Sequence, residues 1–567
     1  MSSSISSAGN SRFVSSSRRA FRWNRWRWPL VVFGVAAGAA GLWASGRPLV
    51  ASAAAAAGGL AVAFAVGIRG LRAALSGGHG IVGVARAVID EAASSRAPML
   101  FMLLSVIGLP MLPLILDAGE RLEYRLQFFL TWSLSTAGFL LAMVTIVLAC
   151  GSVCGDIDSQ RIHMALSKPL ERWQYLAGKW LGIVLLDGLL LGILGGGIYL
   201  GAVALGRLPP VDAADRRAVE EQVLTARSSV RPDHPDGEAF EAAIAATAEQ
   251  IRKDDPGAFA RDPVGVRRRI RSERVLEWHT VTADVVSSYV FRGLDRDRVR
   301  SELLQLRLKP FADNVDVDRA EVRFALWLND RPYPVRGGRH EEYTLPSLMF
   351  HTIDIPASAI DESGSLKVTI ANRNLVPPGE DEITSIAFSP GKGLEILYRS
   401  GSFAGNFARG LLVGWAKLAM LAAVALCAAS WLAFPTAVLA SLMVYVSAVA
   451  RGFLADAIDI YTGADSANAT LGSMLRLRMG MLLERLNHFE WWDAVKTLSS
   501  FAADGFLALV PSFGTHDGVT EVATGSLLPL SQAVGSAGLL GVAYPLVLLA
   551  LGWLLLERRD LVNVSGH

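Results

Sequence analysis

The chain lacks the phosphate-binding loop that a nucleotide-hydrolysing protein needs. Such a loop is rich in glycine and ends in Lys-Ser or Lys-Thr, because its backbone N–H groups and its lysine hold the phosphates, and no such string occurs in the sequence. The Gly-Lys-Gly run at 391–393 has no hydroxyl residue after its lysine. The run from Leu75 to His79 is interpreted as a flexible linker. The chain is therefore not expected to be an enzyme that hydrolyses ATP by itself.

Cysteine is scarce as well. The three cysteines all fall in or at the ends of apolar stretches, at Cys150, Cys154 and Cys427. Cys150 and Cys154 share a helix face, which is compatible with metal binding, but no third or fourth soft ligand is nearby, so we interpret them as small packing residues. The histidines do not stand at ligand spacing, and no catalytic triad or paired carboxylates stand out. The sequence predicts no metal site and no cofactor.

An excess of one charge sign is also missing, whereas apolar residues are abundant. The net charge of +2 argues against a nucleic-acid role. The hydrophobic share of 52% and the mean hydropathy of +0.37 are too high for an ordinary soluble protein. Apolar stretches of roughly 18–25 residues recur, which is enough to cross a bilayer core of about 30 Å. They predict eight transmembrane helices, at 28–46, 49–68, 98–117, 127–150, 180–206, 408–431, 435–453 and 529–556.

The basic residues predict the orientation in the membrane. The first 27 residues contain six arginines and no acidic residue, and such segments stay in the cytoplasm. No clear small-residue cleavage site follows, which argues against a removed signal peptide. Counting eight crossings then places 151–179 and both termini in the cytoplasm, and 207–407 and 454–528 outside.

Residues 207–407 are predicted to form an extracytoplasmic α+β domain. Its first part, about 212–275, has helical apolar spacing in AVEEQVLTAR and EAFEAAIAATAEQIRK. Its second part changes period, and turn dipeptides separate its alternating runs. We expect strands there that end in a small β-sandwich, at 320–328, 349–355, 365–372 and 394–399.

The second external region, 454–528, is amphipathic. MLRLRMGMLLERL at 474–486 has apolar residues at helical spacing with arginines between them, and Trp491 and Trp492 follow. Tryptophan favours the headgroup level of a membrane. We expect one or two helices lying on the outer leaflet. The alternative is a short helical hairpin packed on the β domain.

The most informative run is GSVCGDIDSQRIHMALSKPLERWQYLAGKWLG at 151–182, between two apolar stretches. It is polar, carries both charge signs, and fits a short surface helix broken by proline. It resembles the cytoplasmic coupling segment of ABC-2-type transporter permeases, in which an acid, a polar stretch, a Leu-rich turn, Pro, Arg and Gly-Lys recur in this order. The matching residues here are Asp156, Asp158, Ser159, Leu166, Pro169, Arg172, Gly178 and Lys179. The family often has Glu where this chain has Asp158.

The resemblance implies that the chain is the permease subunit of an ABC-2 transporter in a bacterial plasma (inner) membrane, driven by a separate ABC ATPase subunit. The coupling segment would fit a cleft on that ATPase. Ile162, Leu166 and Leu170 would be apolar anchors, and charged residues would set the register, namely Arg161, Lys168, Glu171 and Arg172. Two permease copies, or a pair of permeases, with two ATPases are the implied assembly. The alternative is an ordinary solvated loop.

Other segments carry the same resemblance. The six core crossings are assigned from residue 98 onward, in the two halves 84–206 and 408–560, so the helices within 28–68 are additions. The run at 84–98 resembles the interfacial elbow helix that enters such cores. The run at 430–442 resembles the tight turn between the fourth and fifth core helices, and the acid–Arg–Arg–acid tail at 557–560 resembles the C-terminal end of family members. VPSFGTHD at 510–517 is similar to the last part of permeases linked to multicopper-enzyme maturation.

Two charged residues lie inside predicted membrane helices, Asp187 and Lys417. Charges at that depth are costly and often functional. They would pair with each other, or Asp187 would line a path through the membrane. We favour structural pairing or snorkelling.

Two functions stay open at this point. The first is a transport permease, with export as the expected direction. The second is a membrane-anchored external binding or assembly module whose core transmits force or acts as a scaffold, which the large external domain favours. A continuous polar path along the dimer seam would distinguish the first from the second.

Overall fold

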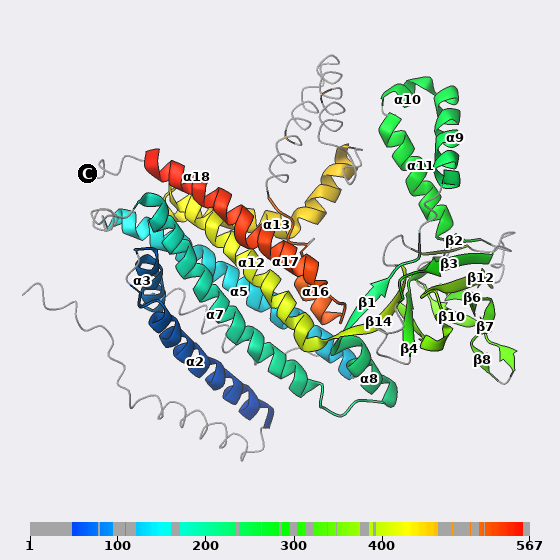
Figure 1. Cartoon of the computed structure of the whole chain (residues 1–567), viewed down its shortest axis with the longest axis horizontal. Coiled ribbons are helices and arrows are strands. Elements are labelled where there is room, and N and C mark those ends of the chain that lie inside the picture. Colours follow the sequence, from blue (N-terminus) through cyan, green and yellow to red (C-terminus); the bar gives the residue numbers. More distant parts are fainter. Residues whose placement is uncertain are drawn as a thin grey trace, which may run out of the picture.

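One part of the molecule is a bundle of long helices, and the other is a set of β-sheets from which a helical arm projects (Figure 1). The computed structural model describes residues 48–77, 80–94, 108, 121–159, 171–233, 238–261, 263–282, 286–294, 303–312, 321–336, 338–347, 349–374, 385–388, 393–462, 479, 499, 510–514 and 516–558.

Six helical segments in the described part of the chain are long and apolar enough to cross a membrane. They lie within α2 (Pro48–Ala74), α5 (Leu122–Asp158), α7 (Arg172–Leu205), α12 (Phe403–Ala429), α13 (Phe434–Thr462) and the continuous run of α17 (Leu530–Gly538), η4 (Leu539–Ala543) and α18 (Tyr544–Arg558). These agree with six of the eight predicted helices. The other two, at 28–46 and 98–117, lie outside the described residues apart from Gly108, as does the amphipathic run at 474–486 apart from Met479.

Several helix boundaries were predicted wrongly. α5 continues past residue 150 to Asp158, and α7 begins at Arg172 instead of residue 180. The polar residues in these added turns find partners inside the bundle, so the helices continue where the hydropathy falls. α12 begins at Phe403, before the predicted 408, because the Ser402 side chain caps it by accepting a hydrogen bond from the Gly405 N–H at 3.3 Å. α13 extends beyond residue 453 to Thr462.

The bundle has two distinct ends. α5 ends, α7 begins and α12 and α18 end at the side that carries Ser159 and Glu171, which we call the loop end (Figure 1). α5 and α12 begin and α7 ends at the opposite side, next to the β-sheets, which we call the domain end (Figure 1). The short helix α3 (Gly80–Ser94), which overlaps the predicted elbow helix at 84–98, packs on α7 at the loop end. Ser159 and Glu171, which lie within the predicted coupling segment, are therefore at the opposite end of the helices from the β-rich region.

The centre of the bundle consists of α5, α7 and α12, whose apolar residues share one core. Two tryptophans also join α7 and α12 by hydrogen bonds. The indole N–H of Trp180 donates to the carbonyl of Ala419 at 2.9 Å, and that of Trp415 donates to the carbonyl of Val184 at 2.8 Å. An indole has an apolar body and one donor, so it can fill a core and satisfy its N–H at the same time.

The β-rich region contains fourteen strands among the described residues. One sheet has the order β1 (Thr225–Val230), β14 (Leu394–Ser402), β4 (Leu303–Leu308) and β11 (His351–Pro356). A second has the order β10 (Tyr343–Pro346), β6 (Glu321–Leu328), β12 (Leu366–Asn372) and β3 (Val286–Phe291), with β7 (Arg331–Tyr333) also paired to β6. Two smaller sheets contain β2 (Thr280–Val281), β13 (Ile386–Phe388) and β5 (Pro310–Ala312), and β8 (Val335–Arg336) and β9 (Arg339–His340).

The two large sheets share one apolar core, as in a sandwich. Leu306 and Ile396 come from the first sheet, and Phe324 and Ile370 come from the second. The alternating runs that predicted four strands correspond to β6, β11, β12 and β14.

The first and last strands of the region, β1 and β14, form a stem that connects it to the bundle. They pair antiparallel, from Thr225 opposite Ser402 to Val230 opposite Ile396. β14 leads directly into α12, and the chain reaches β1 from α7 through α8 (Ala213–Ala218) and η1 (Val219–Val223). The predicted helical character of 212–275 is therefore wrong at β1, because pairing with β14 decides the local structure.

The part of that predicted helical stretch after β1 forms the arm, from α9 (Glu238–Asp254), α10 (Pro256–Arg261) and α11 (Pro263–Trp278). A small core that includes Ile244, Ala248 and Ile270 holds α9 against α11. In Figure 1 the arm rises from the sheets apart from the bundle.

Candidate functional site

A buried ion pair joins three helices at the loop end of the bundle. The ammonium of Lys179, on α7, lies 2.8 Å from the Oδ2 of Asp156 on α5 and 3.6 Å from the Oε2 of Glu91 on α3. It also donates to the carbonyl of Ser152 at 3.0 Å. Lys179 is only 3% exposed, so these oxygens replace the water that its charge would otherwise bind.

Tyr175 completes this cluster. Its hydroxyl donates to the Oδ2 of Asp156 at 2.8 Å, and the Lys179 ammonium lies 5.5 Å from its ring centroid. Asp156 thus receives one hydrogen bond from a neutral donor and one from a cation, both on α7. The end of α5 is therefore fixed to the first turns of α7 by charge-assisted contacts, which are stronger than neutral ones.

Two glycines bring α3 against α7 beside this cluster. A Cβ added at Gly178 would lie 2.7 Å from the Cβ of Val84 and 2.8 Å from the carbonyl oxygen of Ile81. At Gly182 it would lie 2.7 Å from the carbonyl oxygen of Ala85. The two glycines are four residues apart, so they lie on one face of α7. Only residues without a side chain allow the two backbones this close.

Arg172 links the same end of α7 to the end of α18. Its Nη1 donates to the carbonyl of Leu556 at 2.7 Å and to that of Glu557 at 3.1 Å. The last carbonyls of a helix have no partner within the helix, and they carry its partial negative charge. The Arg172 guanidinium satisfies two of them and so joins the chain's last spanning helix to the loop end.

The structure thus brings together four of the residues predicted for the coupling segment: Asp156, Arg172, Gly178 and Lys179. Asp158 is exposed on the last turn of α5. Ile162, Leu166, Lys168 and Pro169 lie outside the described residues. Sequence reasoning missed Glu91 and Tyr175. Glu91 lies in the run recognised as the elbow helix, and its charge was the available signal.

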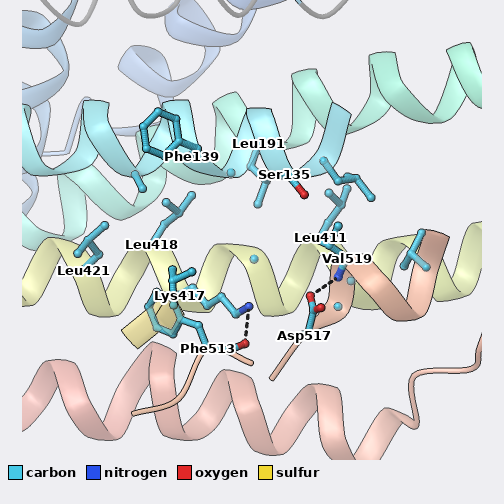
Figure 2. A pocket seen from close by; sticks show the side chains of 18 of the residues that line it. Ser135, Phe139, Leu191, Leu411, Lys417, Leu418, Leu421, Phe513, Asp517 and Val519 are labelled. Atoms are coloured by element: carbon cyan, nitrogen blue, oxygen red, sulfur yellow. Dashed lines mark hydrogen bonds between the residues drawn. The ribbon is translucent and has the colours of Figure 1, made fainter. Parts of the chain in front are cut away.

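The two intramembrane charges are not paired in the described part of the chain. Asp187 is fully buried on α7, and its Oδ2 accepts a hydrogen bond from the hydroxyl of Thr145 at 2.9 Å. Its Oδ1 has no hydrogen-bond partner among the described residues. Lys417, on α12, donates instead to the carbonyl of Phe513 at 3.0 Å (Figure 2). The predicted pairing between Asp187 and Lys417 is therefore not observed.

A short segment at the domain end, residues 524–528, ties the β-sheets to the bundle, and we call it the strap. The Arg227 N–H on β1 donates to the carbonyl of Gly525, and the Leu527 N–H donates to the carbonyl of Arg227, both at 2.8 Å. The guanidinium of Arg227 also donates to the carbonyl of Thr524 at 2.9 Å and to Gln305 on β4 at 2.7 Å. Burial, together with the nearby Arg307, lowers the pKa of Arg227 to about 10.

The other side of the strap is fixed to α12. The Asn406 side chain donates to the carbonyl of Ser526 at 2.7 Å and accepts from the Leu528 N–H at 2.8 Å. Arg409 donates to the carbonyl of Leu528 at 3.0 Å. The strap follows α16 (Gly518–Ala523), so one continuous piece of chain contacts β1, α12 and the start of α17.

Asp215 fixes the beginning of α5 to the segment that leads to β1. Its carboxylate accepts hydrogen bonds from the backbone N–H groups of Leu122, Glu123 and Val211, each at 3.0 Å. Burial acts to raise its pKa, but these three donors and Arg121 outweigh it, so the pKa of Asp215 lies below its usual value. The carboxylate thus satisfies free N–H groups at the start of a spanning helix.

Comparison with known proteins agrees with this geometry. Residues 50–209, from the start of α2 to just beyond α7, match the family described as ABC-2 family transporter protein. This part of the chain is similar to an ABC-2-type permease domain. The match covers the Asp156–Lys179 pair, Glu91 on α3 and Asp187. The predicted resemblance to ABC-2-type permeases is confirmed, whereas the finer likeness to permeases linked to multicopper-enzyme maturation is not supported by it. No curated protein and no solved structure matches the chain.

The match at residues 50–209 and the helices long enough to cross a membrane support a multi-pass membrane protein and a transmembrane transporter subunit. An ABC-2-type permease domain is a membrane component and is not itself catalytic. This agrees with the absence of a phosphate-binding loop from the sequence.

Proposed function

We propose that the chain is the permease subunit of an exporter driven by a separate ABC ATPase, which docks on the loop end at residues 156–175. The observation that carries the proposal is the cluster around Lys179. A rigid junction is needed if a push on the loop is to move whole helices, and the Asp156–Lys179 pair supplies one between α5 and α7. In this view Ile162, Leu166, Lys168 and Pro169 meet the ATPase, and the buried residues behind them pass the motion on.

The proposed orientation of the chain in the membrane is based on the placement of its basic residues. We place the loop end and both termini in the cytoplasm of a bacterial cell, and the β-rich region outside its inner membrane. The first 27 residues are arginine-rich, and further basic residues lie at the loop end, among them Arg72, Arg172, Lys179 and Arg558. Such residues accumulate on the cytoplasmic side of a membrane. Two permease chains with two ATPases complete the proposed assembly.

Docking is tested by co-purification of the complex. Leu166→Asp and Arg172→Glu should each reduce the amount of ATPase recovered with the permease, since loss of an interface anchor typically costs about 2 kcal/mol or more. Arg207→Glu, an exposed residue at the domain end, is the matched control and should leave the yield unchanged. Arg172 also contacts α18, so thermal unfolding must show that its variant is folded. Wild-type recovery of the ATPase with both loop-end variants would refute the docking site.

The sidedness is tested by labelling. Ser363 is exposed in the β-rich region, and the three native cysteines are buried. Ser363→Cys should react with a membrane-impermeant maleimide in cells stripped of their outer membrane. Reaction only after lysis would reverse the proposed topology.

A second candidate function is a force-transmitting scaffold that moves the β-rich region without passing a solute. The observation that favours it is the strap, which holds β1 through Arg227 and α12 through Asn406. A movement of α12 relative to α5 would then be carried into the sheets. In proteoliposomes, an ATP-dependent change in the distance between spin labels at Ser363 and in the bundle, with no solute flux, would support this candidate over the exporter.

A further inference from the structure

A cavity of about 350 Å³ lies between α5, α12, α13 and the segment around α16. Figure 2 shows Phe139 on one side of it, Leu411 and Leu418 along α12, and Phe513 on the opposite side. Its lining is mostly apolar, and its volume is at the lower end of what ligand pockets offer, roughly 300–1,000 Å³. The cavity therefore has room for a small head group and part of one chain, and not for a whole two-chain lipid.

The edge of the cavity faces the surroundings of the bundle. Phe139 on α5 is 49% exposed and Val449 on α13 is 56% exposed, and both line the cavity. These helices are long and apolar enough to cross a membrane, so we expect their exposed apolar side chains to meet lipid and not water. A ligand that enters past Phe139 and Val449 comes from the bilayer, so it must have an apolar part.

One cation points into this apolar space. Lys417 lines the cavity, and its ammonium donates to the carbonyl of Phe513 at 3.0 Å and lies 5.3 Å from that residue's ring centroid (Figure 2). An ammonium has three N–H donors, so this contact leaves others available. Within the described part of the chain, no carboxylate lies within ion-pair distance of Lys417.

Asp517 also lines the cavity, but its carboxylate caps the N-terminus of α16. The Oδ1 of Asp517 accepts hydrogen bonds from the N–H groups of Val519 and Thr520, at 3.0 and 3.4 Å, and so caps α16 (Figure 2). Its charge is attracted to the N-terminus of that helix. Asp517 acts on Lys417 electrostatically but is not within ion-pair distance of its ammonium, so a ligand with an anionic group would supply a direct partner.

We propose that this cavity binds an anionic amphiphile from the bilayer, with a carboxylate or phosphate head at Lys417 and its chain along Leu411, Leu418 and Phe139. The proposal goes beyond the transport function, since it does not depend on whether an ATPase docks at the loop end. The wall that holds Phe513 and Asp517 belongs to the same stretch of chain as α16 and the strap. Binding therefore takes place where the β-rich region is attached to α12.

The experiment uses the full chain in a non-ionic detergent. Binding of dodecanoate, monododecyl phosphate, dodecanol and dodecylamine is measured by native mass spectrometry and by the shift in thermal unfolding. The anionic amphiphiles should bind about tenfold more tightly than dodecanol, because a charge-assisted hydrogen bond is stronger than a neutral one. Dodecylamine should bind most weakly. A preference for dodecanoate indicates a free fatty acid as ligand, and a preference for monododecyl phosphate indicates a phospholipid-type head.

Two kinds of variant test separately the charge of Lys417 and the volume of the cavity. Lys417→Met should lower the affinity for dodecanoate about tenfold and leave dodecanol binding unchanged, and Lys417→Arg should retain most of the dodecanoate binding. Gly138 lines the cavity and has open space where a Cβ would be added, so Gly138→Leu should weaken the binding of every chain. Gly59→Leu, in equally open space on α2, is the control and should change nothing.

The proposal is overturned if folded wild-type protein binds none of the amphiphiles, or if it binds dodecanoate and dodecylamine equally. It is also overturned if Lys417→Met binds dodecanoate as wild type does. If Lys417→Met does not fold, Gly138→Leu and the ranking of the four ligands on the wild-type protein still decide the question. A failure of this test leaves the docking test at Leu166 and Arg172 unaffected.

Discussion

The Lys179 ammonium and the Asp156 carboxylate lie 2.8 Å apart at the point where the end of α5 meets the beginning of α7. In the sequence, this pair lies near the two ends of the segment that was predicted to couple the chain to an ATPase. Asp156 and Lys179 were both predicted as residues that act on the ATPase. The structure shows them in contact with each other and with Tyr175 and Glu91. Their proposed part in coupling is therefore to hold the helices that an ATPase would push.

Loss of one partner of this pair should destabilise the protein strongly. Lys179→Met leaves Asp156 without its cation in a largely shielded site, at a cost of about 3–5 kcal/mol, and should lower the apparent Tm of the detergent-solubilised protein by several degrees. The double variant Lys179→Met, Asp156→Asn should recover part of this loss. Arg274→Ala, which breaks an exposed pair with Glu277 on the arm, should cost less than about 1 kcal/mol. Equal effects of Lys179→Met and Arg274→Ala would contradict the importance of the buried pair.

The contact between α3 and α7 should depend on the absence of a side chain at Gly182. In Gly182→Ala the new methyl group would meet the backbone of Ala85, with its carbonyl oxygen 2.7 Å away, and overpacking of this kind typically costs about 1–3 kcal/mol. Gly192→Ala on the same helix has open space at its Cβ, so it should be neutral or slightly stabilising because alanine favours helix. Thermal unfolding of the two variants side by side measures the difference. Unchanged stability of Gly182→Ala would show that α3 can move away from α7.

The sequence predicted those parts of the fold that depend on a short run of neighbouring residues. A membrane span needs about 20 apolar residues, and six helices were found on that basis. Alternation of apolar residues located β6 and β12 because alternate side chains of each strand enter the shared core. The coupling motif also identified Asp156, Arg172, Gly178 and Lys179 by their order, without any knowledge of their contacts.

The features that could not be predicted depend on contacts between residues that are far apart in the sequence. α5 and α7 extend beyond their apolar stretches because Asp156 and Lys179 neutralise each other. A prediction from hydropathy alone ends each helix near these charged residues, since it does not include their pairing. β1 forms a strand because Thr225 lies opposite Ser402 in β14, a residue far along the chain. Lys417 and Asp187 both lie within apolar helices, but nothing in the sequence showed that Lys417 contacts the carbonyl of Phe513.

The attachment of α5 to the segment before β1 should weaken in acid. The folded state lowers the pKa of Asp215, so its contribution to stability is fully present above the pKa of the unfolded state and is lost as the pH falls through the lower pKa of the folded state. Asp215→Asn has one acceptor oxygen in place of two and should be less stable than wild type at pH 7. Thermal unfolding between pH 7 and pH 3 should show the two proteins converging as the pH falls. A constant difference over that range would argue against the ionised carboxylate as the cause.

The strap should lose its contact with β1 if Gly525 is replaced. Gly525 has a φ of +65°, which favours glycine, and a Cβ there would overlap the carbonyl of Gln222. Gly525→Ala should therefore separate the strap from β1, and amide hydrogen exchange at Arg227 and Leu527 should rise while α5 and α7 stay protected. Gly535→Ala, in open space on α17, should leave exchange at the strap unchanged. Loss of protection throughout the bundle would instead mean that the strap is needed for the whole fold.

The last prediction concerns Asp187, which is buried at the middle of α7 with one oxygen bonded to Thr145. Since no cation is paired with it in the described part of the chain, its removal leaves no unpaired charge there. We therefore expect a structural role, in which Asp187→Asn keeps the shape and the acceptor for the Thr145 hydroxyl. Its apparent Tm and its ATP-driven output with the ATPase partner should stay close to wild type.

Asp187→Leu should also fold, because replacing a buried carboxyl group by an apolar side chain removes a desolvation cost. Thr145→Val is the matched control, since it removes the hydroxyl that contacts Asp187 and leaves the carboxyl group in place. The measurements are the apparent Tm, the ATPase rate of the complex and the output that this rate drives. A folded Asp187→Asn protein with a normal ATPase rate and no output would show that Asp187 lines the path or takes part in gating.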